Sequence, residues 1–292
     1  MEPIFIEKEK QAFFDRNGFV KLTLLSEQQA DELFSFFELK KEEHATVSDL
    51  HHTTTDTGNK DLIIDVDKKI KSVFIPALEK KLQNFKPLVA TYHIKEPGAG
   101  SATGIHQDPT FVDEKAFYSV NVWVALHDIG AENGHLFFIP GSHKAVDSIR
   151  SIPSHPAYYD SFRDELPRLA EAVPLKKGEA VLFSNATVHG ATDNLSPSMR
   201  LAATLLLCSE KATWHLYYNN TEKENALERY NLTMDSFIFV GRGEKPKASF
   251  VEVSSLDAFP VLTFKEFLQK TGLQKERLIC KFSRFIKQKL SL

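Results

Sequence analysis

The chain has 292 residues, of which 42% are hydrophobic and 26% charged, and its formal net charge is −3. These values describe a folded globular protein and exclude disordered and collagen-like chains. The acidic balance gives no electrostatic reason to expect nucleic-acid binding, which needs a basic surface. No stretch has the ~18 apolar residues of a membrane span, and the first residues lack the apolar segment of a signal peptide. We therefore expect a cytoplasmic protein with no membrane span.

The first third of the chain is predicted to be mainly helical. Helical periodicity covers residues 7–16, and residues 19–22 form a short apolar run typical of a strand. Ser26 and Gln29 have the spacing of a capping box, which predicts the start of a second helix, and a third is expected at about residues 62–82. Residues 40–60, which include His51 and His52, are polar. They predict a loop, or a lid that orders over substrate.

The middle of the chain has the pattern of an all-β core. Short apolar runs are separated by turn residues such as Pro97-Gly98, Asn133-Gly134 and Lys177-Gly178. This spacing predicts a double-stranded β-helix, or jelly roll, with flanking helices. The predicted strands are residues 88–94, 117–126, 136–139, 180–183 and 201–208. We expect a single domain over 1–292, with helical support and a variable loop in 1–87, the jelly-roll core in 88–208 and a C-terminal extension in 209–292.

The C-terminal segment, residues 262–292, is predicted to be helical and basic. A solvated helix face and a surface for an anionic partner or a membrane surface both fit this pattern. Cys208 and Cys280 have no spacing typical of a metal or redox pair, so both are expected to be reduced structural thiols.

One group of residues has the pattern of a metal site. His106 and Asp108 are two residues apart in a segment entering the β-rich region, and an extended chain would place both side chains on one face. His189, which follows the apolar run 180–183, is the candidate third ligand. Two histidines and one carboxylate are the ligand set of non-haem Fe(II) oxygenases, in which the other coordination positions stay open.

A cationic residue follows this ligand set. Arg200 lies eleven residues after His189 at the start of the last predicted core strand. A five-carbon keto acid chelated at iron would extend its far carboxylate deeper into the core. Arginine fits such a carboxylate because its planar guanidinium binds in a bidentate manner and stays charged when buried.

Other interpretations of these residues are simpler. His106 and Asp108 could form a surface pair, Arg200 a salt bridge at a strand end, and Trp123 part of the core instead of a pocket wall. The remaining histidines in this region are expected to be structural and not metal ligands; they are His127, His135, His143 and His215.

The chain resembles the phytanoyl-CoA dioxygenase family of Fe(II)/2-oxoglutarate oxygenases over roughly residues 8–210. The resemblance depends on the motif around His106 and Asp108, on His189-Gly190, and on Arg200. It also includes three longer segments: Phe13 to Val20, Asn121 to Leu126, and Glu132 to His143.

This resemblance implies iron ligation by His106, Asp108 and His189, and binding of the co-substrate C5 carboxylate by Arg200. Thr103 matches a hydroxyl that contacts 2-oxoglutarate in some relatives, and Trp123 would line the same cavity. Some relatives have a serine that helps to hold the co-substrate at the position of Ala191. In this chain another hydroxyl group would have to make that contact. The candidates are Thr103, Thr187 and Thr204.

The implied reaction is oxidation of a C–H bond in a small molecule, such as an amino acid or secondary metabolite, by O2. In it, 2-oxoglutarate is converted to succinate and CO2, and ascorbate is a possible stimulant. Hydroxylation is favoured, since halogenases of this superfamily lack the carboxylate that Asp108 supplies. Desaturation and oxidative cyclisation remain open, as does a non-catalytic cupin-like protein that binds metal. The sequence does not indicate an oligomeric state.

Overall fold

The computed structural model describes residues 1–220, 226–233, 236, 245–246, 249–255 and 261–274. Its largest element is a six-stranded sheet in which every neighbouring pair of strands is antiparallel. In spatial order the strands are β1 (Phe19–Thr23), β8 (Glu179–Ser184), β5 (Ser119–Ala125), β10 (Arg200–Ser209), β3 (Phe85–Lys95) and β2 (His51–Thr53).

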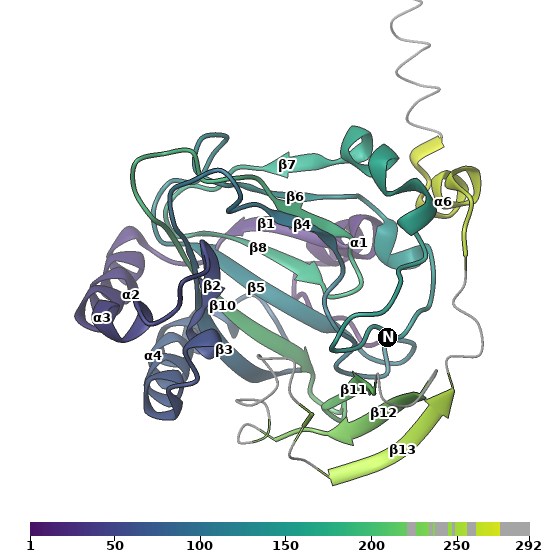
Figure 1. Cartoon of the computed structure of the whole chain (residues 1–292), viewed down its shortest axis with the longest axis horizontal. Helices are drawn as coiled ribbons and strands as arrows, with labels where there is room; N and C mark the ends of the chain where they lie inside the picture. Colours follow the sequence, from purple (N-terminus) through teal and green to yellow (C-terminus); the bar gives the residue numbers. More distant parts are fainter. Residues whose placement is uncertain (221–225, 234–235, 237–244, 247–248, 256–260, 275–292) are drawn as a thin grey trace, which may run out of the picture.

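A second, four-stranded antiparallel sheet packs over the inner face of the first one (Figure 1). Its strands in spatial order are β4 (Thr103–His106), β9 (His189–Ala191), β6 (Leu136–Phe138) and β7 (Glu171–Val173). Trp123 and Phe183 of the large sheet share one buried apolar cluster with Leu136 and Phe138 of the small sheet. Two antiparallel sheets packed in this way form the predicted jelly roll.

Helices cover the outer face of the large sheet (Figure 1). They are α1 (Lys8–Asn17), α2 (Glu27–Leu39), α3 (Lys41–His44) and α4 (Lys60–Leu78). Side chains at helical spacing on α2 and α4, such as Leu33 and Phe74, are fully buried against outward-facing strand residues such as Val122 and Leu205. The predicted capping box is present, because Ser26 accepts from the Gln29 backbone and the Gln29 side chain accepts from the Ser26 backbone.

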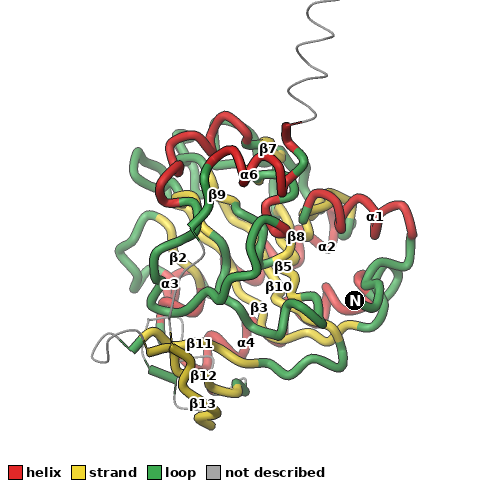
Figure 2. The backbone as a smooth tube through the Cα atoms, turned by 90° about the vertical axis from the view of Figure 1, so that its right-hand side faces the viewer, coloured by secondary structure: helices red, strands yellow, loops and turns green. Residues whose placement is uncertain are grey.

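A third sheet and several short helices extend the core. The sheet consists of β11 (His215–Asn219), β12 (Ala226–Asn231) and β13 (Ser249–Ser255), and it lies at the opposite end of the molecule from α6 (Phe264–Thr271) (Figure 2). Leu216 of β11 packs with Val89 of β3 in one apolar cluster, which attaches this sheet to the large one. The 3-10 helices are η1 (Thr54–Thr57), η2 (Ser142–Lys144) and η3 (Asp160–Leu169).

The expectation of a loop over residues 40–60 is wrong. This segment forms α3, β2 and η1, and β2 pairs with the edge of β3 through the register His51↔Lys95. A polar strand only three residues long has no hydrophobic alternation from which it could be predicted. Of the predicted helix over 262–292, α6 is described; the basic residues from Lys275 onward and Cys280 lie outside the described residues.

Leu33 and Leu39 give a matched test of this packing, since both lie on α2. Leu33 is fully buried and Leu39 is 82% exposed. We expect Leu33→Ala to lower the free energy of unfolding by about 2–5 kcal/mol because it leaves a cavity. Leu39→Ala should change it by less than about 0.5 kcal/mol. Urea denaturation followed by circular dichroism measures both, and equal effects would contradict the described packing.

Candidate metal and co-substrate site

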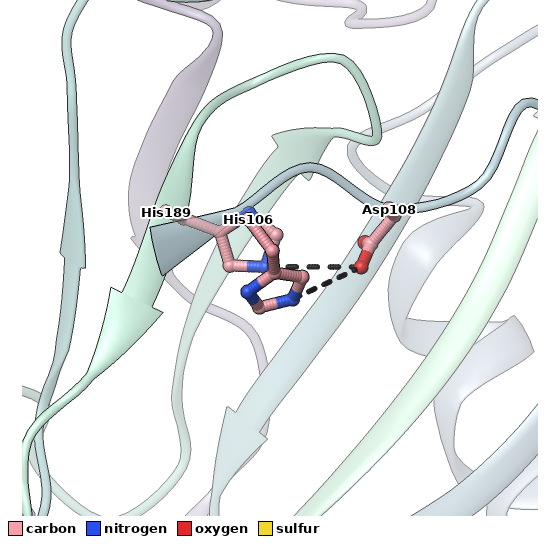
Figure 3. Close-up of side chains that lie close together, drawn as sticks. All are labelled: His106, Asp108 and His189. Carbon is pink, nitrogen blue, oxygen red and sulfur yellow. Dashed lines mark ion pairs between the residues drawn. The ribbon is translucent and has the colours of Figure 1, made fainter. Parts of the chain in front are cut away.

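Strand pairing brings the three candidate ligands together. His106 ends β4 and is the register partner of His189, the first residue of β9. The two strands approach closely at Gly190, where a Cβ atom would lie 2.8 Å from the Thr103 carbonyl oxygen. Asp108 lies just beyond β4, and its backbone N–H donates to the Asn185 carbonyl at 3.0 Å. The three side chains point toward one another between the sheets (Figure 3).

The donor atoms have the spacing of a metal site. Asp108 Oδ1 lies 3.6 Å from His106 Nε2 and 3.8 Å from His189 Nε2, and one ligand atom from each residue falls within 4.8 Å of the others. Metal–ligand bonds of roughly 2.0–2.2 Å at right angles would place donors roughly 3 Å apart, so a small contraction suffices. This set is the only such cluster of three or more potential ligands in the described part of the chain.

Backbone carbonyls fix the tautomers of both imidazoles. His106 Nδ1 donates to the Gly104 carbonyl at 2.8 Å, and His189 Nδ1 donates to the Thr187 carbonyl at 2.9 Å. Since a carbonyl can only accept, each Nδ1 carries a proton, and the neutral form of each ring therefore presents its Nε2 lone pair to a metal. His189 is held further by aromatic contacts with Phe138 and Phe183, at ring-centroid distances of 5.7 and 4.7 Å.

Electrostatics also favour a bound cation. Burial would raise the pKa of Asp108, but the two imidazoles and Asn121 outweigh it and lower that pKa to about 2. Burial lowers the pKa of His189 to about 4. For His106, burial acts to lower the pKa, but the hydrogen bond and charge of Asp108 raise it above the usual value. At neutral pH the site therefore offers an ionised carboxylate and a neutral His189.

Arg200 lies at the inner end of the same cavity. Its side chain is 1% exposed, and its guanidinium carbon lies 5.0 Å from the Trp123 ring centroid. Nη1 donates to the Gly134 carbonyl at 3.1 Å, whereas the buried Nε has no hydrogen-bond partner. Within the described residues no carboxylate pairs with this guanidinium. The salt-bridge interpretation of Arg200 therefore has no support there, and Trp123 is a wall of the cavity as well as a core residue.

A second cation increases the positive charge near Arg200. Lys95 of β3 is its register partner and is completely buried. Burial and the charge of Arg200 lower the pKa of Lys95 to about 7, and its Nζ donates to the Thr192 carbonyl at 2.7 Å. The Lys95 stem packs against Gly134, where a Cβ would come within 2.9 Å and φ is +81°. Position 134, whose carbonyl accepts a hydrogen bond from Arg200, therefore requires glycine.

The cavity between the metal ligands and Arg200, here called the inner cavity, has further polar walls. Thr103 faces it and lies directly opposite Ala191 in the β4–β9 register. Thr103 Oγ1 lies 3.1 Å from Nδ1 of His51, which also lines the cavity. Thr187 and Thr204 are not among its lining residues; Thr187 donates to the Gly18 carbonyl and Thr204 to that of Thr91.

Sequence reasoning missed His93 of this cavity and left the role of His51 open. His93 lines the inner cavity, and its ring lies 5.7 Å from that of His51, whose role the sequence did not indicate. The alternation of β3 could have identified His93, because Tyr92 and Ile94 point into the outer core and place His93 on the inner face. Burial holds the pKa of His93 down to about 3 and that of His51 to about 2, so both are neutral at pH 7.

The histidines expected to be structural lie outside the inner cavity. His143 Nε2 donates to the Asp15 carbonyl at 3.1 Å, and His127 Nε2 accepts from the Leu201 backbone at 2.9 Å. His135 is hydrogen-bonded to the Gly130 carbonyl at 3.2 Å, and His215 belongs to β11. None of them lines the inner cavity.

A second, larger cavity lies beside His106. It has a volume of about 560 Å³, is called the outer pocket here, and shares only His106 with the inner cavity. Its wall is mostly one continuous segment, residues 148–159, together with Arg163.

Metal binding can be tested by removing one ligand. Since loss of a residue that merely supports a ligand costs roughly 10–100-fold in affinity, Asp108→Ala should weaken binding by at least about 100-fold. His135→Ala, which leaves the three ligands in place, is the control. Titration with Co²⁺, followed by its visible absorption, measures the affinity. Equal affinities of the wild type and Asp108→Ala would contradict the assignment.

Proton release on metal binding should depend on pH in a defined way. The raised pKa of His106 means that the metal-free site carries a proton there at pH 6, which a metal must displace. Asp108 and His189, with pKa values of about 2 and 4, contribute little at this pH. We expect more protons to be released per metal at pH 6 than at pH 8.5. Calorimetry in buffers of different ionisation enthalpy measures this number, and a release independent of pH would refute it.

The chain is similar to known proteins in sequence and in fold. Residues 14–202 match the family model described as phytanoyl-CoA dioxygenase (PhyH). A phytanoyl-CoA dioxygenase domain-containing protein 1 from Danio rerio is 34% identical over 145 residues, covering 46% of this chain and 50% of that protein. Phytanoyl-CoA dioxygenase 1 from Oryza sativa subsp. japonica is 33% identical over 168 residues, covering 53% of this chain and 54% of its own length. The chain thus spans about half the length of the curated relatives it matches.

Solved structures share the fold. The carbocyclase SnoK from nogalamycin biosynthesis, described as non-haem and α-ketoglutarate-dependent, has a TM-score of 0.53 at 22% identity and covers 72% of this chain and 86% of its own. The epimerase SnoN, solved with Fe³⁺, α-ketoglutarate and a nogalamycin compound, has a TM-score of 0.51 at 20% identity, with coverages of 71% and 85%. Because the family model matches more than half of the sequence, the chain belongs to the phytanoyl-CoA dioxygenase (PhyH) family.

Proposed function

We propose that this protein is an Fe(II)/2-oxoglutarate-dependent dioxygenase that hydroxylates a C–H bond of a small molecule. The proposal assigns His106, Asp108 and His189 as the iron ligands, which would leave three coordination positions for co-substrate and O2. Iron(II), when bound there, supplies the one-electron chemistry with which O2 is activated while 2-oxoglutarate is converted to succinate and CO2.

The observation that carries this proposal is the buried, unneutralised guanidinium of Arg200. A buried cation without a counter-ion costs several kcal/mol, so the fold needs a reason to keep it. The far carboxylate of 2-oxoglutarate provides that reason: it would pair with Arg200 while the keto acid end of the same molecule reached the metal ligands. A protein that only binds metal has no use for this arginine, which argues against a non-catalytic cupin-like role.

Two further residues are proposed to hold the co-substrate. Thr103 fits the part of the missing serine, since it lies opposite Ala191 and faces the inner cavity. Hydrogen bonding to His51 orients its hydroxyl group. The Trp123 ring holds the Arg200 guanidinium by a cation–π contact and so fixes its direction.

The remaining assignments concern substrate, outcome and location. The substrate is proposed to be an amino acid or secondary metabolite that enters through the outer pocket. Asp108 occupies the position that a halogenase would leave open for chloride, which favours hydroxylation over halogenation. We further propose a single domain over residues 1–292 and a cytosolic location. No helix in the described ranges is both long and apolar enough to cross a membrane.

Succinate formation gives the direct test of the co-substrate assignment. With Fe(II), ascorbate and O2, Arg200→Ala should raise the KM for 2-oxoglutarate by roughly 100-fold, because a charge-assisted hydrogen-bond pair is worth about 3 kcal/mol. Arg168→Ala, at a surface arginine, is the control and should behave as the wild type. No metal-dependent succinate from the wild type with any metabolite pool would contradict the proposal. The product mass separates hydroxylation, a gain of one oxygen, from desaturation or cyclisation, a loss of two hydrogens.

A further inference from the structure

The outer pocket has charged walls that are already neutralised. Arg150 forms an ion pair with Glu114 at 2.6 Å, and its other donors bind the backbone carbonyls of Asp108 and Ser148 at 2.6 and 2.9 Å. Both side chains of this pair are largely buried, at 10% and 18% exposure. The guanidinium is thus held by the protein itself, and a substrate carboxylate would have to compete with Glu114 for it.

Arg163 is also paired, but its ion pair lies at the surface, because the Arg163 and Asp160 side chains are 44% and 41% exposed. Its Nη2 lies 2.6 Å from Asp160, its Nη1 donates to the Ile105 carbonyl at 2.5 Å, and its guanidinium lies over the Tyr159 ring at 5.1 Å. Together the two arginines bind the backbone on both sides of His106, through Ile105 and Asp108. Their positions suit a structural clamp on the metal-binding segment better than a receptor for a substrate anion.

No acidic side chain occurs among the described residues that line the outer pocket. A substrate ammonium group would therefore leave water without gaining a counter-ion, which is unfavourable. Burial lowers the pKa of His155, so this residue of the wall is neutral at pH 7. The pocket lining thus offers neither an unpaired cation nor an anion to a charged substrate.

The rest of the lining is apolar or polar without charge. Aliphatic and aromatic residues make up just over half of the lining residues, and Gln107 and Ser154 provide neutral hydrogen-bonding groups. The volume of about 560 Å³ is in the range of pockets that enclose drug-sized ligands and exceeds the needs of a free amino acid. The apolar lining residues are Ile105, Pro109, Ile149, Ile152, Pro153, Pro156, Ala157, Tyr158 and Tyr159.

From these observations we infer that the outer pocket takes an uncharged molecule with an alicyclic or aromatic ring body and hydroxyl or carbonyl groups. That this occupant is the substrate oxidised at His106, Asp108 and His189 rests on the proposed function. Of the two classes named above, the inference selects a neutral secondary metabolite and excludes free amino acids.

Three probes with one ring body test the charge preference directly: 1-adamantanol, 1-adamantanamine and adamantane-1-carboxylate. Their binding to the full-length, metal-free protein is measured by calorimetry at pH 7.5. We expect the alcohol to bind at least about tenfold more tightly than either ion. The same titrations on Arg200→Ala identify any carboxylate that binds in the inner cavity instead, and those on Asp108→Ala identify any ammonium that binds at the metal site. A charged probe that binds as tightly as the alcohol in the wild type and in both variants, or no binding of the alcohol, would overturn the inference.

A charge introduced at Ser154, an exposed residue of the wall, provides the matched variant pair. Ser154→Asp should increase the affinity for 1-adamantanamine by about tenfold, whereas Ser154→Asn, of similar size, should not. If both variants bind the amine as weakly as the wild type does, the probes do not occupy this pocket and the inference fails. Because these are binding measurements without iron or 2-oxoglutarate, absence of succinate formation would reject the proposed function while leaving the charge preference intact.

Discussion

The buried guanidinium of Arg200 is the constraint on which the account of this molecule depends. It lies on the central strand β10, stacked on Trp123 and bound to the Gly134 carbonyl, and no described carboxylate neutralises it. Lys95, its register partner, is also buried. The Arg200 guanidinium makes this end of the inner cavity favourable for an anion, and Lys95, whose pKa is about 7, adds positive charge when it is protonated. The candidate metal ligands lie at the other end of the cavity, so the same anion must also carry a group that can chelate the metal.

The two sheets explain why these ends face each other. The large sheet supplies Arg200 and Trp123, whereas the small sheet supplies His106 and His189, so the cavity lies between layers whose separation is set by the packing of Phe138, Phe183 and their neighbours. Helices bury the opposite face of the large sheet and make it rigid. The segment that carries His106 and Asp108 is held by Arg150 and Arg163, which donate to the backbone carbonyls of Asp108 and Ile105. Both arginines line the outer pocket.

How much could be predicted from the sequence depended on the length of the periodic signal. Long apolar runs gave β5, β8 and β10, and the capping box gave the start of α2. Of the four three-residue strands, β6 was predicted because it lies in the apolar run 136–139, whereas β2, β7 and β9 carry too few residues for a strand pattern to be recognised. The ligand set could be predicted because His106 and Asp108 are close in sequence. His93 and the contact between His51 and Thr103 depend on strand register, and the paired arginines of the outer pocket depend on partners 3 and 36 residues away.

The central claim is that Arg200 recognises the far carboxylate of a keto acid held at the metal. Anaerobic titration of the Fe(II) protein, followed by the charge-transfer absorption of the chelated keto acid, can compare 2-oxoglutarate with 2-oxopentanoate, which has the same chain length and lacks that carboxylate. The account predicts that the wild type prefers 2-oxoglutarate by roughly 100-fold and that Arg200→Ala loses this preference. A preference that survives in Arg200→Ala, or is absent from the wild type, would contradict it.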